Sequence, residues 1–102
     1  MSKQPKLKPP TDYVYYINPG TGKYHIFDHD VSEAEVVDFF DEQLFSASYR
    51  KRDGSWEVDG YVDGRFLKIA FRVLEDGRYY IITAYDIRNA HQIEELKRIF
   101  DL

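Results

Sequence analysis

The sequence predicts an α+β domain: a four-stranded antiparallel meander sheet with two helices packed on one face, preceded by an N-terminal hairpin or arm. Three Asp-Gly pairs separate strand-like segments, at residues 53–54, 63–64 and 76–77. Asp-Gly is typical of a two-residue β-hairpin loop. Segments with apolar residues at helical spacing flank this region. With 102 residues and no cysteine, the chain has the size of one domain that folds without disulfides.

The first eleven residues, MSKQPKLKPPT, are basic and carry three of the four prolines of the chain. We therefore expect a disordered basic tail over residues 1–11 and a single α+β domain over residues 12–102. After the tail, two aromatic and β-branched runs flank residues 18–22, which contain a proline and two glycines. This pattern predicts a hairpin or an extended arm with a wide turn.

Two helices are predicted from capping residues and apolar spacing. Ser32 and Glu35 form a capping box ahead of an apolar stripe, which predicts a helix over residues 33–42. Asn89, followed three residues later by Gln92, predicts the start of a second helix over residues 90–100. We expect both helices to pack on the apolar face of the sheet.

Pairing outward from the three turns assigns every strand side chain to one face of the sheet. One face collects the apolar residues, among them Trp56, Ile69 and Ile82, and is the predicted core face. The opposite face mixes charged and aromatic side chains. It includes Lys68 and Arg72, which lie four positions apart in an otherwise apolar run.

The same pairing predicts neighbours across the strands of the charged face. Asp59, Lys68 and Tyr85 should lie side by side, and Arg50 should lie opposite Glu57. One interpretation is a solvated face whose ion pairs specify the strand register. The other is a cleft for an anionic substrate.

The histidines do not predict a metal site. His25 and His29 are four residues apart, a separation of about 13 Å on a strand. No third ligand has suitable spacing, so we expect neither a metal nor a cofactor. His29 lies between Asp28 and Asp30 just before the first helix, where it can either order the turn through hydrogen bonds or transfer protons.

The formal net charge of −4 disfavours nucleic-acid binding through bulk charge, although it is compatible with a local basic patch. No apolar run approaches the roughly 20 residues that a membrane-spanning helix needs. No apolar segment of signal-peptide type follows the N-terminal lysines. We therefore expect a cytoplasmic protein with no membrane partner.

Three segments follow one another between the predicted hairpin and the closing helix: HDVSEAEVVDFF, DGRFLKIAF and RYYIITAYD. In this order, over residues 24–100, the chain resembles the BrnT-type proteins, small RelE-fold ribonuclease toxins of bacterial toxin–antitoxin pairs. It is also similar to a broader group of uncharacterised bacterial proteins. The resemblance implies an α+β fold, metal-independent RNA cleavage by basic and acidic side chains on the sheet, and a neutralising antitoxin.

The match is local, and the chain also departs from the toxin pattern. Gly64-Arg65 corresponds to the Gly-Arg pair with which a strand of these toxins begins. Tyr85 stands where the toxins have arginine, and a further arginine is missing near Tyr79 or Tyr80. The closing helix, HQIEELKRIF, is less basic than theirs. These departures remove several phosphate contacts.

Two functional classes follow. The first is a BrnT-like toxin acting as an endoribonuclease, with RNA-binding residues Arg50, Arg65, Arg72 and Tyr85 and catalytic residues Lys68, Asp59, Glu57 and His29. The second is a non-catalytic interaction module that binds through the same aromatic and charged face. The expected partners are accordingly RNA, an antitoxin protein, or a second copy in a homodimer.

Overall fold

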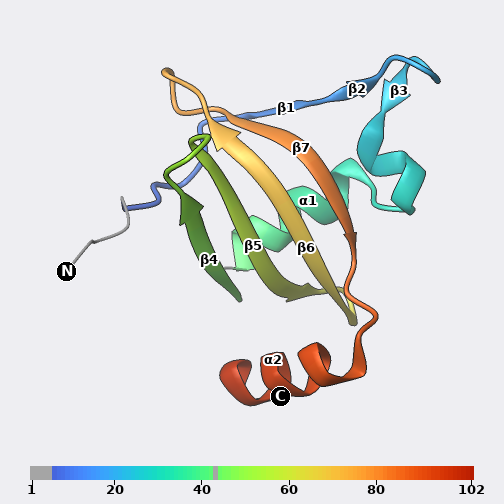
Figure 1. Cartoon of the computed structure of the whole chain (residues 1–102), viewed down its shortest axis with the longest axis vertical. Helices are drawn as coiled ribbons and strands as arrows, with labels where there is room; N and C mark the ends of the chain where they lie inside the picture. The colour runs from blue at the N-terminus through green and yellow to red at the C-terminus, as the bar shows by residue number, and fades with distance from the viewer. Residues whose placement is uncertain (1–5, 43) are drawn as a thin grey trace.

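The computed structural model describes residues 6–42 and 44–102 and has an α+β fold (Figure 1). A five-stranded sheet has the strand order β1-β7-β6-β5-β4, and β2 and β3 form a small second sheet. The elements in chain order are β1 (Tyr13–Tyr15), β2 (Ile17–Asn18), β3 (Lys23–Tyr24), the 3-10 helix η1 (His25–His29), α1 (Glu33–Glu42), β4 (Phe45–Arg50), β5 (Ser55–Val62), β6 (Arg65–Val73), β7 (Tyr79–Asp86) and α2 (Ala90–Phe100).

The predicted antiparallel meander is present as β4 to β7, but it is part of a larger, mixed sheet. β1 pairs with β7 in parallel, with Tyr13 opposite Tyr79 and Tyr15 opposite Ile81. The prediction of a four-stranded, purely antiparallel sheet was therefore only partly correct. Turn signals cannot predict the additional pair, because no hairpin joins two parallel strands.

The β5–β6 hairpin has the predicted register. Asp63 and Gly64 have φ angles of 50° and 82°, as a type I′ turn requires at both central positions. Val62 pairs with Arg65, and counting outward from this pair places Asp59 opposite Lys68, as the structure does.

The other two hairpins have longer loops than predicted. Arg50, rather than Arg52, pairs with Ser55, so the β4–β5 loop has four residues, 51–54. This moves the register by two residues, and an even shift keeps each side chain on its predicted face. In the β6–β7 hairpin Val73 pairs with Tyr79, and the register moves by one residue.

A β-bulge halfway along β7 cancels this one-residue shift of the register. Ala70 pairs with Thr83, whereas the next residue of β6, Phe71, pairs with Ile81. Ile82 is the extra residue of the bulge. Beyond the bulge, pairing toward the end of β7 follows the predicted register.

The bulge changes which residues of β7 enter the core. Tyr79 and Ile81 are buried, with 2% and 0% of their surface exposed. Ile82 and Tyr80, which the pattern assigned to the core face, are only partly buried. That assignment was wrong because the β6–β7 loop has three residues, 75–77, instead of the predicted two; a hydrogen bond from Leu74 N to Arg78 O at 2.8 Å closes it.

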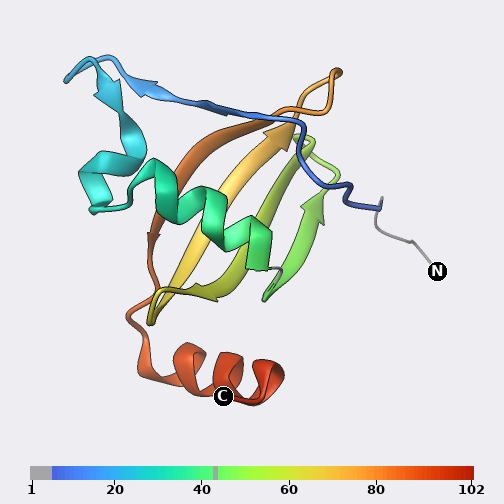
Figure 2. The same ribbon diagram turned by 180° about the vertical axis from the view of Figure 1, so that it is seen from behind.

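Helix α1 crosses the core face of the sheet (Figure 2). Its start is the predicted capping box: Glu35 N donates to Ser32 Oγ, and Ser32 N donates to Glu35 Oε1, both at 3.1 Å. Val36, Phe39 and Phe40 are buried and belong to the main core cluster. The helix predicted over residues 33–42 is confirmed.

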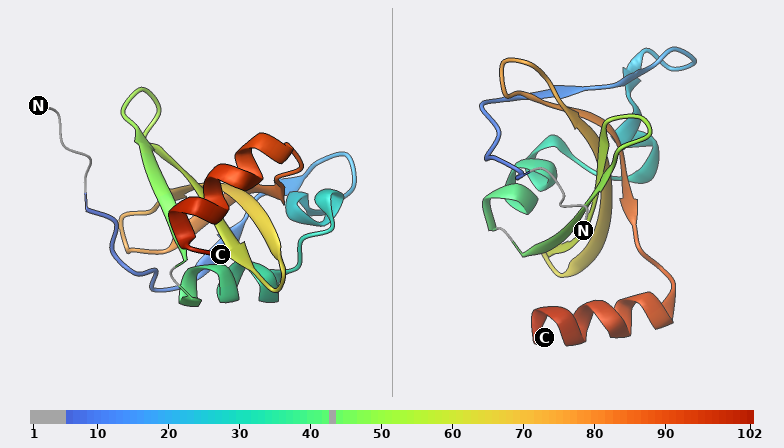
Figure 3. Two further views of the ribbon diagram at one scale, coloured as in Figure 1. Left: turned by 90° about the horizontal axis from the view of Figure 1, so that it is seen from below. Right: turned by 60° about the vertical axis from the view of Figure 1, so that its left-hand side comes forward.

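Helix α2 has the predicted bounds but not the predicted position. Asn89 caps it by accepting a hydrogen bond from Gln92 N at 3.1 Å. Its Leu96 packs with Phe66 and Ile87 in a separate small cluster at the end of the sheet (Figure 3). Phe66 neighbours Lys68 on the face opposite α1, so the prediction that both helices pack on one face was wrong.

Residues 6–11 of the predicted tail run along the domain and contact it. Leu7 packs against the main core, and the hydroxyl of Tyr79 donates a hydrogen bond to the carbonyl of Lys8. Thr11 N donates to Gly77 O at 3.1 Å. Residues 1–5 of the predicted tail lie outside the described residues. In the described part of the chain, no helix combines the length and apolar character needed to cross a membrane.

Candidate functional site

The sheet face that α1 leaves uncovered is called the outer face here. It faces the viewer in Figure 1, with α2 beyond one end and the β4–β5 loop at the other. Strand pairing arranges its side chains in three rows. Starting next to α2, these are Ser46, Asp59, Lys68 and Tyr85; then Ser48, Glu57, Ala70 and Thr83; then Arg50, Ser55, Arg72 and Tyr80.

Lys68 lies between two carboxylates on this face. Its Nζ is 2.9 Å from Glu57 Oε1 and 3.3 Å from Asp59 Oδ1. Burial alone would lower the pKa of Lys68, but the hydrogen bond to Glu57 and the charge of Asp59 outweigh burial and raise it. Lys68 is therefore a cation at neutral pH, suited to holding an anion rather than to accepting a proton.

Arg50 extends this chain of charges, because it forms an ion pair with the second carboxylate oxygen of Glu57. In the predicted register Arg50 and Glu57 were directly opposite. In the structure Ser48 is opposite Glu57, and the long arginine side chain reaches it from two residues away. The predicted pair therefore forms despite the changed loop.

The end of the outer face near the β4–β5 loop is basic. Arg72 lies between Ser55 and Tyr80 in the third row and is exposed. Within residues 6–42 and 44–102, no hydrogen bond or ion pair involves its side chain. Asp53 of the loop lies within reach of its charge: hydrogen bonds from Ser55 are the main cause of the lowered pKa of Asp53, and Arg72 adds to them. The exposed Lys51 and Arg52 follow Arg50 in the adjoining loop.

Tyr85 and His29 lie along the β7 side of the outer face, in the half of β7 that β1 does not pair with. This side is called the β7 edge. Tyr85 is directly opposite Lys68, and its ring centre lies 5.9 Å from that of His29. Helix η1 supplies His29 and lies against β7. A hollow of about 440 Å³ opens beside the two rings, lined also by Asp28, Asp30, Thr83, Asp86 and Arg88.

His25 and His29 are in contact, contrary to the strand-based expectation. A 3-10 helix rather than a strand holds them, and their ring centres are 5.1 Å apart. His25 Nδ1 lies 3.2 Å from Asp28 Oδ2, which accepts a hydrogen bond from Asn18 Nδ2 at 2.8 Å. The Asn18 and His25 contacts hold the pKa of Asp28 below its usual value. The described residues contain no group of three acidic or histidine side chains arranged to bind a metal.

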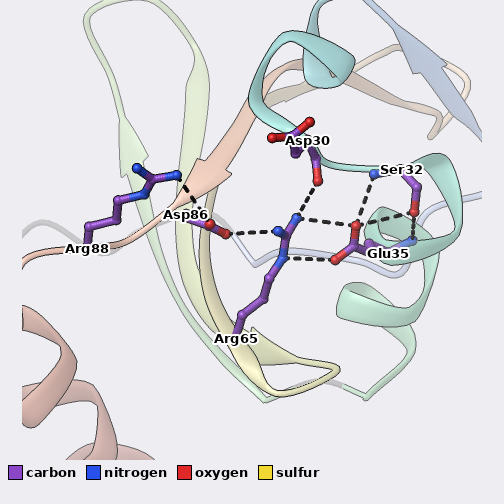
Figure 4. Close-up of polar contacts among 6 residues, drawn as sticks. All are labelled: Asp30, Ser32, Glu35, Arg65, Asp86 and Arg88. Carbon is purple, nitrogen blue, oxygen red and sulfur yellow. Dashed lines mark hydrogen bonds and ion pairs between the residues drawn. The ribbon is translucent and has the colours of Figure 1, made fainter.

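Arg65 lies away from the outer face, in a cluster that joins β6 to three other segments (Figure 4). Its guanidinium lies 2.9 Å from Glu35 Oε2 and 3.2 Å from Asp86 Oδ1, and it donates to the carbonyl of Asp30 at 2.8 Å. These contacts explain Arg65 as a structural residue. Its predicted role in substrate binding stays a prediction.

The structure thus gathers seven of the eight predicted site residues. Those on the outer face or its β7 edge are His29, Arg50, Glu57, Asp59, Lys68, Arg72 and Tyr85. Sequence reasoning did not single out Lys51, although three consecutive basic residues beside an Asp-Gly turn were a usable signal. The predicted register placed Arg52 on this face opposite Ser55, whereas the structure places it in the β4–β5 loop. It also missed the contact of His25 with His29, since no residue pattern marked the 3-10 helix.

Comparisons of this chain with models of protein families, with curated proteins and with solved structures find no match. The geometry and charge of the outer face are therefore the basis for a functional proposal.

Proposed function

We propose that the outer face binds single-stranded RNA and that the protein is a BrnT-like ribonuclease of the toxin type, acting without a metal. The observation that carries this proposal is the local charge. The three rows hold three cations, Arg50, Lys68 and Arg72, against two carboxylates, Glu57 and Asp59. The whole chain, by contrast, has a net charge of −4. A basic patch on an acidic protein is an expected feature of a nucleic-acid site.

The spacing of the cations suits an extended phosphate backbone. Arg72 and Lys68 project from the same strand four residues apart, which corresponds to about 13 Å. Arg72 has no ion pair within the described residues and can bind a phosphate directly, in exchange for its weaker attraction to Asp53. Lys68 has to exchange part of its contact with Glu57 or Asp59 for a phosphate oxygen. The rings of Tyr80 and Tyr85 on the neighbouring strand offer stacking surfaces for bases.

Cleavage of RNA without a metal requires a group that removes a proton from the ribose 2′-hydroxyl, so that the oxygen attacks the neighbouring phosphorus. The P–O5′ bond then breaks, leaving a 2′,3′-cyclic phosphate, and the departing 5′-oxygen takes a proton from the protonated base or from water. Lys68 is unsuited to this step because its pKa is raised. Glu57 and Asp59 are both held by Lys68. His29, exposed at the β7 edge beside Tyr85, is the remaining predicted group, and we assign proton transfer to it.

Binding and cleavage of a short single-stranded RNA test this proposal. Replacing Arg52 and Arg72 with alanine should weaken binding and make it less dependent on salt, by about 0.7 in the log–log slope for each lost phosphate contact. The matched control replaces Lys97 and Arg98 of α2, which removes the same charge elsewhere. Equal loss in both double variants, or no RNA binding at low salt, would reject the proposal. His29→Gln should abolish cleavage while leaving binding intact.

A second function, a non-catalytic interaction module, is favoured by a different observation. Lys68 and Arg50 are already paired with carboxylates, whereas Tyr85 is 38% exposed. On this alternative an antitoxin or other protein partner covers the face, and Tyr85→Ala weakens binding more than Lys68→Ala. Added salt then has little effect, in contrast to the RNA proposal.

A further inference from the structure

We propose that the free edge of β1 pairs with β1 of a second copy, so that the protein forms an antiparallel, edge-to-edge homodimer. The proposal concerns a surface outside the outer-face site and does not depend on RNA binding. β1 is the last strand of the five-stranded sheet and pairs only with β7 among the described residues. Figure 2 shows β1 along the border of the molecule, with no other strand on its far side.

The backbone of this segment presents a regular set of outward-facing groups. Asp12 O accepts from Tyr79 N, and Tyr16 N donates to Ile81 O, each at 2.9 Å. The even-numbered residues of the segment therefore turn their backbone groups toward β7. Because alternate residues of a strand point their N–H and C=O groups to opposite sides, Tyr15 turns its groups away from the sheet. Ile17 is the first residue of β2 and pairs with Tyr24 of β3. The neighbouring bond from His25 N to Tyr16 O makes this a non-hydrogen-bonded pair, so the N–H and C=O of Ile17 also turn outward.

The side chains of the segment do not protect this edge. Residues 13–17, YVYYI, contain no charge, proline or glycine and consist only of aromatic and β-branched residues. Natural sheet edges are usually protected by charged residues or proline. The opposite edge follows that rule, since β4 ends in Arg50 and continues into Lys51 and Arg52. The exposed fractions of Tyr16 and Ile17 are 38% and 52%.

The segment is complementary to itself in an antiparallel register centred on Tyr15. A twofold axis through Tyr15 places Tyr13 opposite Ile17 and Val14 opposite Tyr16 of the second copy. Asp12 then faces Asn18, so no like charges meet. The same twofold axis thus lets the outward backbone groups of the two copies hydrogen-bond to one another and places compatible side chains opposite each other. A closed dimer requires both.

Apolar side chains of the outer face lie next to the proposed pairing segment. Val14 pairs with Tyr80 in the sheet, and both lie with Tyr16 and Leu74 around a shallow apolar hollow. Pairing would bring the hollows of the two copies together. A twofold axis perpendicular to the sheet would place both outer faces on one side and both α1 helices on the other. Five paired residues make a small interface, so the dimer should be weak and dependent on concentration.

Sedimentation equilibrium of the full chain, from about 10 μM to about 1 mM, tests the proposal in a range suited to weak interfaces. The mass should rise from 12.1 kDa toward twice that value. Tyr16→Lys should abolish the rise by placing a charge on the edge. The matched control, Ser48→Lys, adds the same charge to β4, where the side chain is also exposed, and should leave the rise unchanged.

Amide hydrogen exchange of the unaltered protein gives a second readout that needs no variant. The amides of Tyr15 and Ile17 should become protected as concentration increases, whereas those of β4 should not. A monomer at every concentration would overturn the proposal. So would a dimer that Ser48→Lys disrupts and Tyr16→Lys does not, or one that leaves the amides of Tyr15 and Ile17 unprotected.

Discussion

Arg65, the first residue of β6, forms a two-point contact with Glu35 in the first turn of α1. Its Nε lies 2.9 Å from Glu35 Oε2, and a terminal nitrogen donates to Glu35 Oε1 at 3.2 Å. The same carboxylate accepts the hydrogen bond of the Ser32 backbone in the capping box. One glutamate thus caps the helix and attaches it to the sheet.

Replacing Arg65 with alanine should lower the free energy of unfolding by about 1–3 kcal/mol, because partly buried Glu35 and Asp86 lose a charged hydrogen-bonding partner. Arg65→Lys should recover only part of the loss, since an ammonium cannot form the two-point contact. Urea unfolding measures both changes. Arg88→Ala is the control, because that side chain is 87% exposed and should change stability by less than about 0.5 kcal/mol. Unchanged stability of Arg65→Ala would show that the cluster is not structural.

Gly60 of β5 lies directly beneath the ring of Phe39 from α1. A Cβ atom at this position would lie 2.6 Å from Phe39 Cζ and 2.7 Å from the carbonyl oxygen of Leu44. Gly60→Ala should therefore cost about 1–3 kcal/mol through overpacking. Gly20→Ala is the matched control, because the nearest atom there, Asn18 Oδ1, is 3.3 Å away. Equal unfolding midpoints in urea for the two variants would contradict this account.

Deleting residues 2–11 should lower the thermal midpoint by more than about 4 °C, which corresponds to roughly 1 kcal/mol in a domain of this size. The reason is the loss of the Leu7 packing and of the Tyr79 hydrogen bond to Lys8. Tyr79→Phe isolates the hydrogen bond and should show a smaller decrease. A truncated protein with an unchanged midpoint would instead support the sequence-based expectation of a disordered tail.

Alkaline pH should unfold the protein through its buried tyrosines. Burial raises the pKa of Tyr13 and Tyr79 from 10.0 to about 12, and that of Tyr15 further still. Between pH 10 and about 12 these tyrosines keep protons in the folded state that they lose in the unfolded state. The folded state then binds more protons, so stability is complete below pH 10 and falls as pH rises.

Urea unfolding at a series of alkaline pH values measures this loss, and tyrosinate absorbance reports the ionisation. Tyr13→Phe should make the decline shallower, because one group with a raised pKa is removed. Below pH 10, where Tyr13 keeps its proton in both states, the variant and the unaltered protein should show the same pH dependence. A stability that does not change above pH 10 would contradict the prediction.

The sequence by itself determined the features that depend on neighbouring residues. Asp63 and Gly64 adopt the positive φ angles of a tight turn, and this turn alone places Asp59 opposite Lys68. Both helices begin at their predicted caps, since capping is a contact over three residues. The side chains of β4 were also assigned to the correct face of the sheet, although the β4–β5 loop was predicted too short. A register shift of two residues leaves each side chain on the same face.

Tertiary structure alone decided the features that depend on distant segments. The bulge at Ile82 compensates for a three-residue loop, so Lys68 faces Tyr85 as predicted although Tyr79 replaced Tyr80 in the core. β1 pairs with β7 although no turn connects the two strands. Helix α2 packs on Phe66 because that residue is left uncovered at the end of the outer face. The position of each of these segments depends on the apolar surface and the backbone groups that are still uncovered once the local helices and hairpins have formed. No short sequence pattern encodes that information.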